Sequence, residues 1–416
     1  MTVFKKKTEL AKGVFWPSYL IGIAVIVLGI ANQKLFGSIL DAGLNWVSDN
    51  FGWWLVLFAL ILLLLVFALA FPKARHVVNG GAGAKPEYMM WQWFSMSLKG
   101  GIGTGILFWA MGEPIFHMAA PPAAAGAQPF TREAGLFAIS QTMLHWTIAQ
   151  YAMYSLCAVG VALMAYNRRR TISVSSIFEP YLSSSVYGVV KTVVPMVSLF
   201  CIVGALACSM AVGLMQINSG LNFFFGLPID GVTVFAIAAI MVTVYVVSCL
   251  TGIKKGMRVL SSFCTIVFIG LMVYVLCLGP TRFIVDAGTE SLGGFFNRFL
   301  EHSVILPTMA ENETWSKSWI IMFMASFFVY APIIGLFLAR PGKGRTVREF
   351  IFMNIGAPTL FCIVWIAIWG GTTVWLQYTG IMDVWQSVNE KGLEVTIFTI
   401  LSTLPFAKIL AAFFII

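Results

Sequence analysis

A run of glycines inside an apolar segment is the first feature that indicates chemistry. The stretch KGGIGTGILFWAMGEP (residues 99–114) opens with a lysine and continues with closely spaced glycines. Glycine in a helix interior costs about 1 kcal/mol relative to alanine, and a charge at bilayer depth costs about 2.5 to 3.5 kcal/mol. Close packing of small residues would explain the glycines alone. Glu113 and Pro114 add a second irregularity, so an unwound helix that binds an ion or solute is equally supported.

Hydrophobicity predicts the helices that would position this stretch. Of the 416 residues, 59% are hydrophobic and 10% are charged, whereas soluble proteins have about 25% charged residues. A membrane span needs about 20 apolar residues. We expect a polytopic membrane protein with spans at roughly 14–33, 52–72, 91–118, 136–166, 190–218, 232–250, 259–280, 318–339, 351–376, and a tenth from Pro405. Because the tenth run reaches Ile416 without a polar exit, we expect a truncated chain that does not function by itself.

The distribution of lysine and arginine predicts orientation. Most of these residues lie in alternate loops, such as 168–170 and 340–348, and cytoplasmic loops are the ones that carry excess positive charge. The N-terminus is therefore expected in the cytoplasm. This topology signal accounts for the net charge of +9, and no basic patch with interleaved aromatics indicates a nucleic-acid partner.

The sequence indicates neither an enzyme nor a metal protein. The seven cysteines form no CxxC pair, so we interpret them as buried free thiols. The four histidines are scattered in the sequence, and no HExxH or GxSxG motif occurs. We expect no catalytic residues, no metal ligands and no cofactor. The histidines are His76, His117, His145 and His302. A channel would need pore-lining polar groups on several helices, and only isolated polar groups are present.

Four stretches, in order, resemble motifs of the betaine/carnitine/choline transporter family. Residues 101–114 resemble its glycine-rich third helix, G-x-G-x-G-x-x-F-[YW]-x-x-x-E-P, and residues 145–148 resemble its H-W-[GT]-x motif. Residues 252–261 resemble G-x-x-K-G-x-R-x-[LA]-S, and residues 338–349 resemble L-A-R-x-x-x-G-R-T-[VI]-R-E. The resemblance covers nearly the whole chain.

The resemblance implies an all-α fold of the leucine-transporter kind, built from two inverted five-helix repeats within twelve helices. About ten helices would be present: residues 1–90 as a tail with two accessory helices, 91–280 as the first repeat, and 318–416 as an incomplete second repeat. Residues 281–317 are amphipathic and are expected to lie along the outer surface. The family also implies a homotrimer in the inner (plasma) membrane of a bacterium. The unwound helix is then the preferred interpretation of Gly101, Gly103 and Gly105.

The resemblance implies a secondary carrier of small quaternary-ammonium or zwitterionic solutes, moved by alternating access. A trimethylammonium group is held by aromatic rings through cation–π attraction. In the family these rings come from the fourth and eighth helices. Trp146, Tyr151 and Tyr154 match the fourth-helix positions and fall roughly on one helix face; without the resemblance they would fit a packing stripe.

The eighth helix departs from the family. Its segment FMASFFVYAP lacks the usual tryptophan-dense pattern, and a serine and a phenylalanine stand at two tryptophan positions. The changed wall favours a less methylated or sulfonated zwitterion or an amino-acid derivative as an alternative substrate, and an osmosensor of the same fold is a third alternative. The remaining expected pocket residues are Ser326, Phe327, Tyr330, Trp319 and Phe116.

Two charged residues, Lys99 and Glu113, are expected to have roles at this site. In sodium-coupled members, carbonyls near the third-helix glycines hold the ion, and Lys99 lies beside them. We expect its ammonium to replace sodium and to brace the third helix against the tenth; the alternative is a snorkelling lysine that reaches water. Coupling to sodium is left undecided. Glu113 is expected to pair with helix-end amides or to contact the solute.

Overall fold

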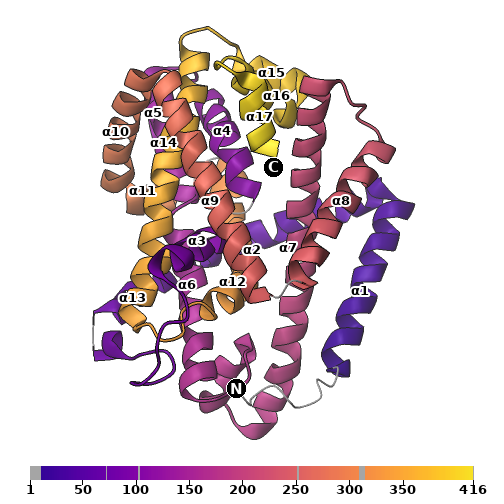
Figure 1. Ribbon diagram of the computed structural model, residues 1–416, viewed down its shortest axis with the longest axis vertical. Helices are drawn as coiled ribbons and strands as arrows, with labels where there is room; N and C mark the ends of the chain where they lie inside the picture. The colour runs from indigo at the N-terminus through magenta and orange to yellow at the C-terminus, as the bar shows by residue number, and fades with distance from the viewer. Residues whose placement is uncertain (1–10, 72, 102–103, 251–252, 309–313, 416) are drawn as a thin grey trace.

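The protein is described by a computed structural model that covers residues 11–71, 73–101, 104–250, 253–308 and 314–415 (Figure 1). All regular structure in these ranges is helical, apart from one isolated β-bridge between Val78 and Thr346. The expected all-α class is confirmed.

Seventeen α-helices make up the described fold. They are α1 (Lys12–Ala31), α2 (Gln33–Ala70), α3 (Met90–Gly101), α4 (Thr104–Ala119), α5 (Arg132–His145), α6 (Ile148–Ala162), α7 (Ser184–Phe225), α8 (Gly231–Leu250), α9 (Ile253–Leu278), α10 (Thr281–Asn297), α11 (Phe299–Ser303), α12 (Met322–Ala339), α13 (Val347–Ile351), α14 (Ala357–Tyr378), α15 (Val384–Lys391), α16 (Leu393–Ser402) and α17 (Ala407–Ile415). Short 3₁₀ or π-helical segments are η1 (Lys73–His76), η2 (Ala123–Ala125), η3 (Leu163–Asn167), η4 (Val174–Tyr181), η5 (Lys317–Ile321) and η6 (Phe352–Gly356).

Seven helices of the described residues are long and apolar enough to cross a membrane, as judged by length and composition. All seven coincide with expected spans. The expected span 232–250 is α8, and the span expected from Pro405 begins as α17. The expected span 91–118 corresponds to α3 and α4, between which Ile102 and Gly103 lie outside the described residues.

The sequence analysis missed α15 and α16, which lie between the ninth and tenth expected spans. Figure 1 shows both helices beside α17 at one end of the molecule. α15 and α16 pack against each other, and α16 also packs against α4 and α7. Leu393 fits against Gly112, where an added Cβ would lie 2.5 Å from the leucine side chain. The pair therefore covers one end of α4.

The amphipathic segment contains α10 and α11. α10 packs against α5 and α14 and buries an apolar face that includes Ile284 and Phe295. Its opposite face carries exposed charges, including Asp286, which forms an ion pair with Arg282. This division of the helix follows its amphipathic pattern.

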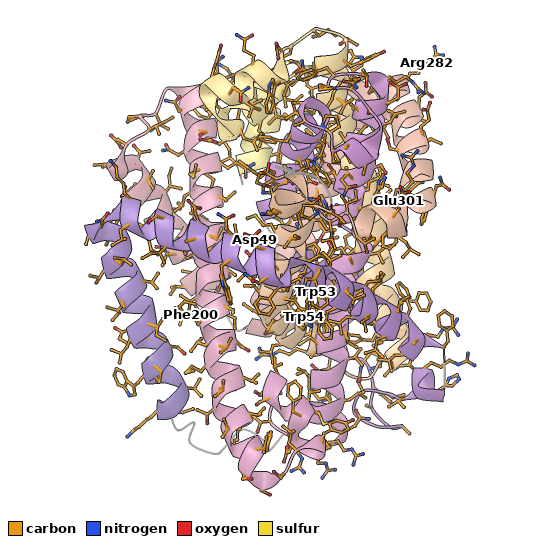
Figure 2. All side chains as sticks on the ribbon, turned by 180° about the vertical axis from the view of Figure 1, so that it is seen from behind. Asp49, Trp53, Trp54, Phe200, Arg282 and Glu301 are labelled. Carbon is orange, nitrogen blue, oxygen red and sulfur yellow. The ribbon has the colours of Figure 1, made fainter. Side chains whose placement is uncertain are left out.

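α2 runs obliquely across one face of the molecule, outside the central helices (Figure 2). Trp53 and Trp54 on this helix are 57% and 42% exposed. Apolar side chains facing outward are ordinary in a bilayer, because lipid tails are as apolar as the protein interior. By contrast, α4, α5 and α14 pack closely on one another and α12 packs closely on α6, and these helices surround the buried polar residues described next.

Candidate functional site

The glycine-rich stretch is helical wherever it is described. Gly101 is the last residue of α3 and Gly105 lies in the first turn of α4, so their backbones are helical in this structure rather than unwound. Gly103 lies outside the described residues. A Cβ at Gly105 would lie 2.9 Å from the Trp146 ring. The glycine at 105 therefore allows the ring of Trp146 to approach the α4 backbone closely.

Lys99 contacts a different helix from the one expected. Its Nζ lies 3.1 Å from the centroid of the Phe268 ring on α9, a cation–π arrangement. α3 packs against α9, whereas the tenth expected span is α17. The expectation that Lys99 braces the third helix against the tenth is therefore not met here. Cys264 lies one turn before Phe268 on the same helix face.

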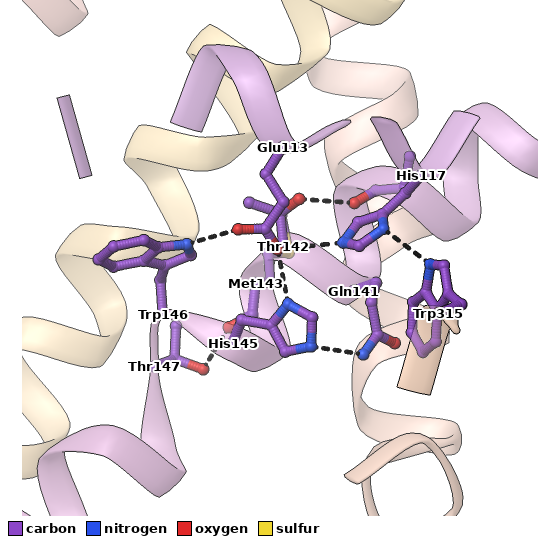
Figure 3. Close-up of polar contacts among 10 residues, drawn as sticks. Glu113, His117, Gln141, Thr142, Met143, His145, Trp146, Thr147 and Trp315 are labelled. Carbon is purple, nitrogen blue, oxygen red and sulfur yellow. Dashed lines mark hydrogen bonds and ion pairs between the residues drawn. The ribbon is translucent and has the colours of Figure 1, made fainter. Parts of the chain in front are cut away.

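Glu113 forms the centre of a buried polar cluster. Its carboxylate is fully buried and lies 3.1 Å from His117 Nε2 and 2.6 Å from His145 Nδ1. The indole of Trp146 donates to the other oxygen at 2.8 Å (Figure 3). The expectation that Glu113 pairs with helix-end amides is wrong, because its partners are side chains of α4 and of the end of α5.

Two further side chains fix the orientation of the imidazoles. Trp315 Nε1 donates to His117 Nδ1 at 3.2 Å, and Gln141 Nε2 lies 3.0 Å from His145 Nε2 (Figure 3). We call these residues the His cluster: Glu113, His117, Gln141, His145, Trp146 and Trp315.

The sequence analysis treated the histidines as scattered, and for two of them this was wrong. His117 lies one turn after Glu113 on α4, and His145 lies one turn after Gln141 on α5. Pairs at i, i+4 share a helix face, so the spacing was a usable local signal. The meeting of the two faces depends on the packing of α4 against α5, which no local pattern encodes.

The cluster has ligand atoms close enough for a metal ion, but its hydrogen bonds do not suit one. Glu113, His117 and His145 offer atoms within 4.8 Å of one another. The Trp315 N–H occupies the Nδ1 lone pair of His117, so the imidazole proton is on Nε2, which faces the carboxylate. A metal would need the Nε2 lone pair. The residues present therefore form a proton-bearing network.

A line of contacting rings runs along one face of η5 and α12. Trp319, Phe323 and Phe327 are spaced at i, i+4 and i+8, with ring centroids 6.2 Å and 5.9 Å apart in succession. Phe323 also stacks on His145 at 4.4 Å and meets the Trp146 ring edge-on at 5.5 Å. We call Trp319, Phe323 and Phe327 the aromatic stripe. Phe323 was missed, although its spacing from Trp319 and Phe327 was visible in the sequence.

Further aromatic rings extend the stripe at its Trp319 end. Phe116 lies 6.0 Å from Trp319 and 5.5 Å from Trp385 of α15. Trp319 also lies 4.4 Å from His117. The stripe is thus joined directly to the His cluster.

Two tyrosines occupy the other end of the stripe. Tyr154 lies 6.5 Å from Phe327 and 6.4 Å from Tyr151, with rings nearly perpendicular. The Tyr151 hydroxyl lies 3.3 Å from Cys362 Sγ, and Gln150 donates to the Tyr154 hydroxyl at 3.2 Å. Both tyrosines are buried. We call Tyr151, Tyr154 and Phe327 the Tyr end.

Two expected pocket residues lie apart from these contacts. The hydroxyl of Ser326 donates to the Met322 carbonyl of its own helix at 2.8 Å. The hydroxyl of Tyr330 lies 3.0 Å from Ser209 Oγ and donates to the Ala205 carbonyl at 3.1 Å, both on α7. The structure therefore joins the other expected pocket residues through Phe323 but gives these two hydroxyls partners elsewhere.

Comparison with known proteins gives a consistent result over almost the whole chain. The profile of the BCCT, betaine/carnitine/choline family transporter, matches residues 13–416. The chain is 26% identical to a probable glycine betaine transporter of Desulfitobacterium hafniense (strain Y51), over 94% of this chain and 77% of that protein. It is 27% identical to an ectoine/hydroxyectoine transporter of Virgibacillus pantothenticus, over 97% and 80%. It is 28% identical to the high-affinity choline transport protein of Escherichia coli (strain K12), over 80% and 49%.

Proposed function

This chain belongs to the betaine/carnitine/choline family of transporters, and from that premise we propose that it carries a small solute with a trimethylammonium head. The family and the relatives compared are transporters, so the chain is a multi-pass membrane transporter and not an enzyme. The relatives are named for glycine betaine, ectoine and choline. Choline or glycine betaine is the solute class proposed here.

The aromatic stripe beside a buried carboxylate is the observation that supports this proposal. Phe323 and Trp146 meet edge to face at 5.5 Å, and Glu113 accepts from the same indole. Rings that face a desolvated cation contribute about 2 kcal/mol or more. The departure at Ser326 argued for a less methylated zwitterion, but its hydroxyl is bonded to Met322, and Phe323 supplies a ring that the sequence analysis did not count.

The proposed solute-binding residues keep six of the eight expected from the sequence and add two. They divide between the fourth and eighth family helices, with two, Glu113 and Phe116, from the third. The set is Phe116, Trp146, Tyr151, Tyr154, Trp319, Phe327, and now Phe323 and Glu113, while Ser326 and Tyr330 are proposed as neighbours of the pathway rather than ligands.

We further propose the family arrangement for the whole protein. Residues 91–280 and 318–416 would belong to two inverted repeats, with residues 1–90 and the amphipathic segment 281–317 outside them. The assembly would be a homotrimer in a bacterial plasma membrane, with the N-terminus in the cytoplasm. Unwinding at Gly101, Gly103 and Gly105 would accompany the transport cycle.

Lys99 is proposed to replace a coupling sodium ion at the glycine-rich stretch. Its side chain is half-buried and its Nζ rests on Phe268, which places the amine between α3 and α9. Equal solute affinity in sodium and in potassium would agree with this role. Stronger binding in sodium would contradict it.

The proposal is tested by solute binding to the full-length protein in detergent. Choline, glycine betaine and ectoine are titrated against wild type, Phe323→Ala and Phe328→Ala, each in sodium and in potassium. Phe328 is a matched control because it lies on the same helix but packs against Phe58 of α2. We expect Phe323→Ala to weaken choline binding about tenfold and Phe328→Ala to leave it unchanged. Equal weakening by both variants would contradict the proposed site.

A further inference from the structure

We propose that the His cluster is a single-proton site, and that a cationic solute binds in exchange for that proton. This inference rests on the proposed function, because it needs a solute cation near Glu113. It adds a coupling ion, the proton, and names His145 as the residue that takes it up.

The hydrogen bonds of Glu113 indicate an ionised carboxylate. Its two oxygens face three N–H-bearing groups, from His117, His145 and Trp146. Among the ion pairs of the described residues, Glu113 pairs with the two histidines and with no lysine or arginine. If both histidines are neutral, the fully buried cluster carries one uncompensated negative charge. Burying such a charge is costly, so the site favours a positive ligand.

His117 cannot take up a second proton without losing a hydrogen bond. A neutral imidazole has one N–H and one accepting nitrogen. Trp315 donates to Nδ1, so the N–H of His117 is on Nε2 and points to Glu113. Protonation at Nδ1 would place two N–H groups against each other.

His145 can take up a second proton at Nε2, because the amide of Gln141 can turn to accept a hydrogen bond from it. The amide nitrogen of Gln141 lies 3.0 Å from His145 Nε2, which therefore accepts, while Nδ1–H donates to Glu113. The Gln141 Oε1 atom is buried and has no hydrogen-bond partner among the described residues. A half-turn of the amide would present Oε1 to a protonated Nε2. One proton moves from water to His145, and the cluster charge changes from −1 to 0.

The surroundings of the cluster leave this charge balance intact. Trp319 and Phe323 cover the two imidazoles with rings, and Phe137 separates His117 from His302 of α11. Arg132 of α5 is paired with Glu290 of α10 at an exposed position. The other titratable side chains on elements packed against α4 and α5 are Glu133, Tyr151, Tyr154, Cys157, Tyr187, Lys191, Cys201, Cys208, Arg282, Asp286, Glu301, Cys362, Tyr378, Glu390, Lys391 and Glu394.

Trp146 links the proton to the solute. Its indole N–H holds Glu113, and its ring faces Phe323, so a cation against these rings lies beside the same carboxylate. Either the proton or the solute cation neutralises the buried charge. Whichever binds second gains no such attraction, so each weakens binding of the other to the same extent.

The test is calorimetric titration of choline into the full-length protein between about pH 5 and pH 8. Below the midpoint of the transition, we expect release of one proton per choline bound and an affinity that falls about tenfold per pH unit; above it, we expect neither. His145→Gln keeps a donor for Glu113 but cannot take up the proton, so its choline affinity should not vary with pH. His302→Gln, which removes a buried imidazole outside the cluster, should behave as wild type.

If the choline affinity of the wild-type protein does not vary with pH, the inference is overturned and the proposed function stands. A second measurement does not depend on the solute: the acid titration of wild type should show one more proton bound than that of His145→Gln. If the two titrations coincide, the inference is also overturned. Choline that binds at no pH would refute the proposed function, and the acid titrations alone would then decide the proton site.

Discussion

The two ends of the aromatic stripe differ in burial and in chemistry: Trp319 and Phe323 are partly buried, whereas the residues of the Tyr end are buried. At one end, Trp319 and Phe323 lie against a carboxylate and two imidazoles. At the Tyr end, Phe327 lies against Tyr154, and the nearby polar atoms are a hydroxyl, an amide and a thiol. Rings alone therefore do not distinguish the ends. The charge of the Glu113 carboxylate distinguishes them. From this difference we infer that the His cluster selects the cation while the Tyr end shapes the space beyond it.

Phe327→Ala should have the largest effect of the substitutions considered and should act on stability. Phe327 is 3% exposed, and removing a buried phenylalanine side chain costs about 3–5 kcal/mol. We expect a clear fall in the thermal midpoint of the detergent-solubilised protein. Phe328→Ala, on the partly buried neighbour, is the control and should cost less.

Glu113→Gln should have the next largest effect and should act on recognition. The amide keeps the size of the side chain but removes the charge that attracts the cation. We expect choline affinity to fall about 100-fold, which corresponds to about 2.7 kcal/mol. Glu290→Gln removes an exposed carboxylate at a distance and should leave the affinity unchanged; an equal loss from both variants would show that overall charge, and not the cluster, attracts the solute.

Gly105→Ala should have a smaller effect, confined to the His cluster. The added methyl group would lie 2.9 Å from the Trp146 ring, so the ring must shift by a few tenths of an ångström. Overpacking of this kind costs about 1–3 kcal/mol. We expect weaker choline binding together with a change in tryptophan fluorescence. Unchanged fluorescence and affinity would show that Trp146 does not need its present position.

Tyr151→Phe should have the smallest effect and should leave choline affinity unaltered. It removes one hydrogen bond to Cys362, worth about 0.5–1.5 kcal/mol. Thermal unfolding and choline titration of the same sample separate the two quantities. A large loss of affinity would show that the Tyr end, too, recognises the solute head.

The fold was predictable where one local property decided it. Apolar length placed α1, α12 and α14 close to their observed bounds. α15 was missed because it is short and polar, and α16 because ten residues are fewer than a span requires. Their positions depend on packing against α4 and α7.

The candidate site was predictable only in part, for a physical reason. Trp146 and Phe327 were proposed through the resemblance, and in the structure both rings contact Phe323. Phe323 was overlooked because the family pattern places tryptophans at neighbouring positions instead. The meeting of His117 and His145 at Glu113 depends on how α4 crosses α5, and that crossing is set by packing along the whole interface.

The difference between the two ends is tested most directly by two solutes that have the same shape but differ in charge. Choline and 3,3-dimethyl-1-butanol have the same shape, but the second carries a carbon in place of the nitrogen and has no charge. Both are titrated into the full-length wild-type protein at about pH 8, the upper end of the range in which histidine side chains ordinarily change charge. We expect choline to bind at least about tenfold more tightly than the uncharged alcohol. Equal affinities would mean that the rings select shape only, and would contradict the role given to Glu113.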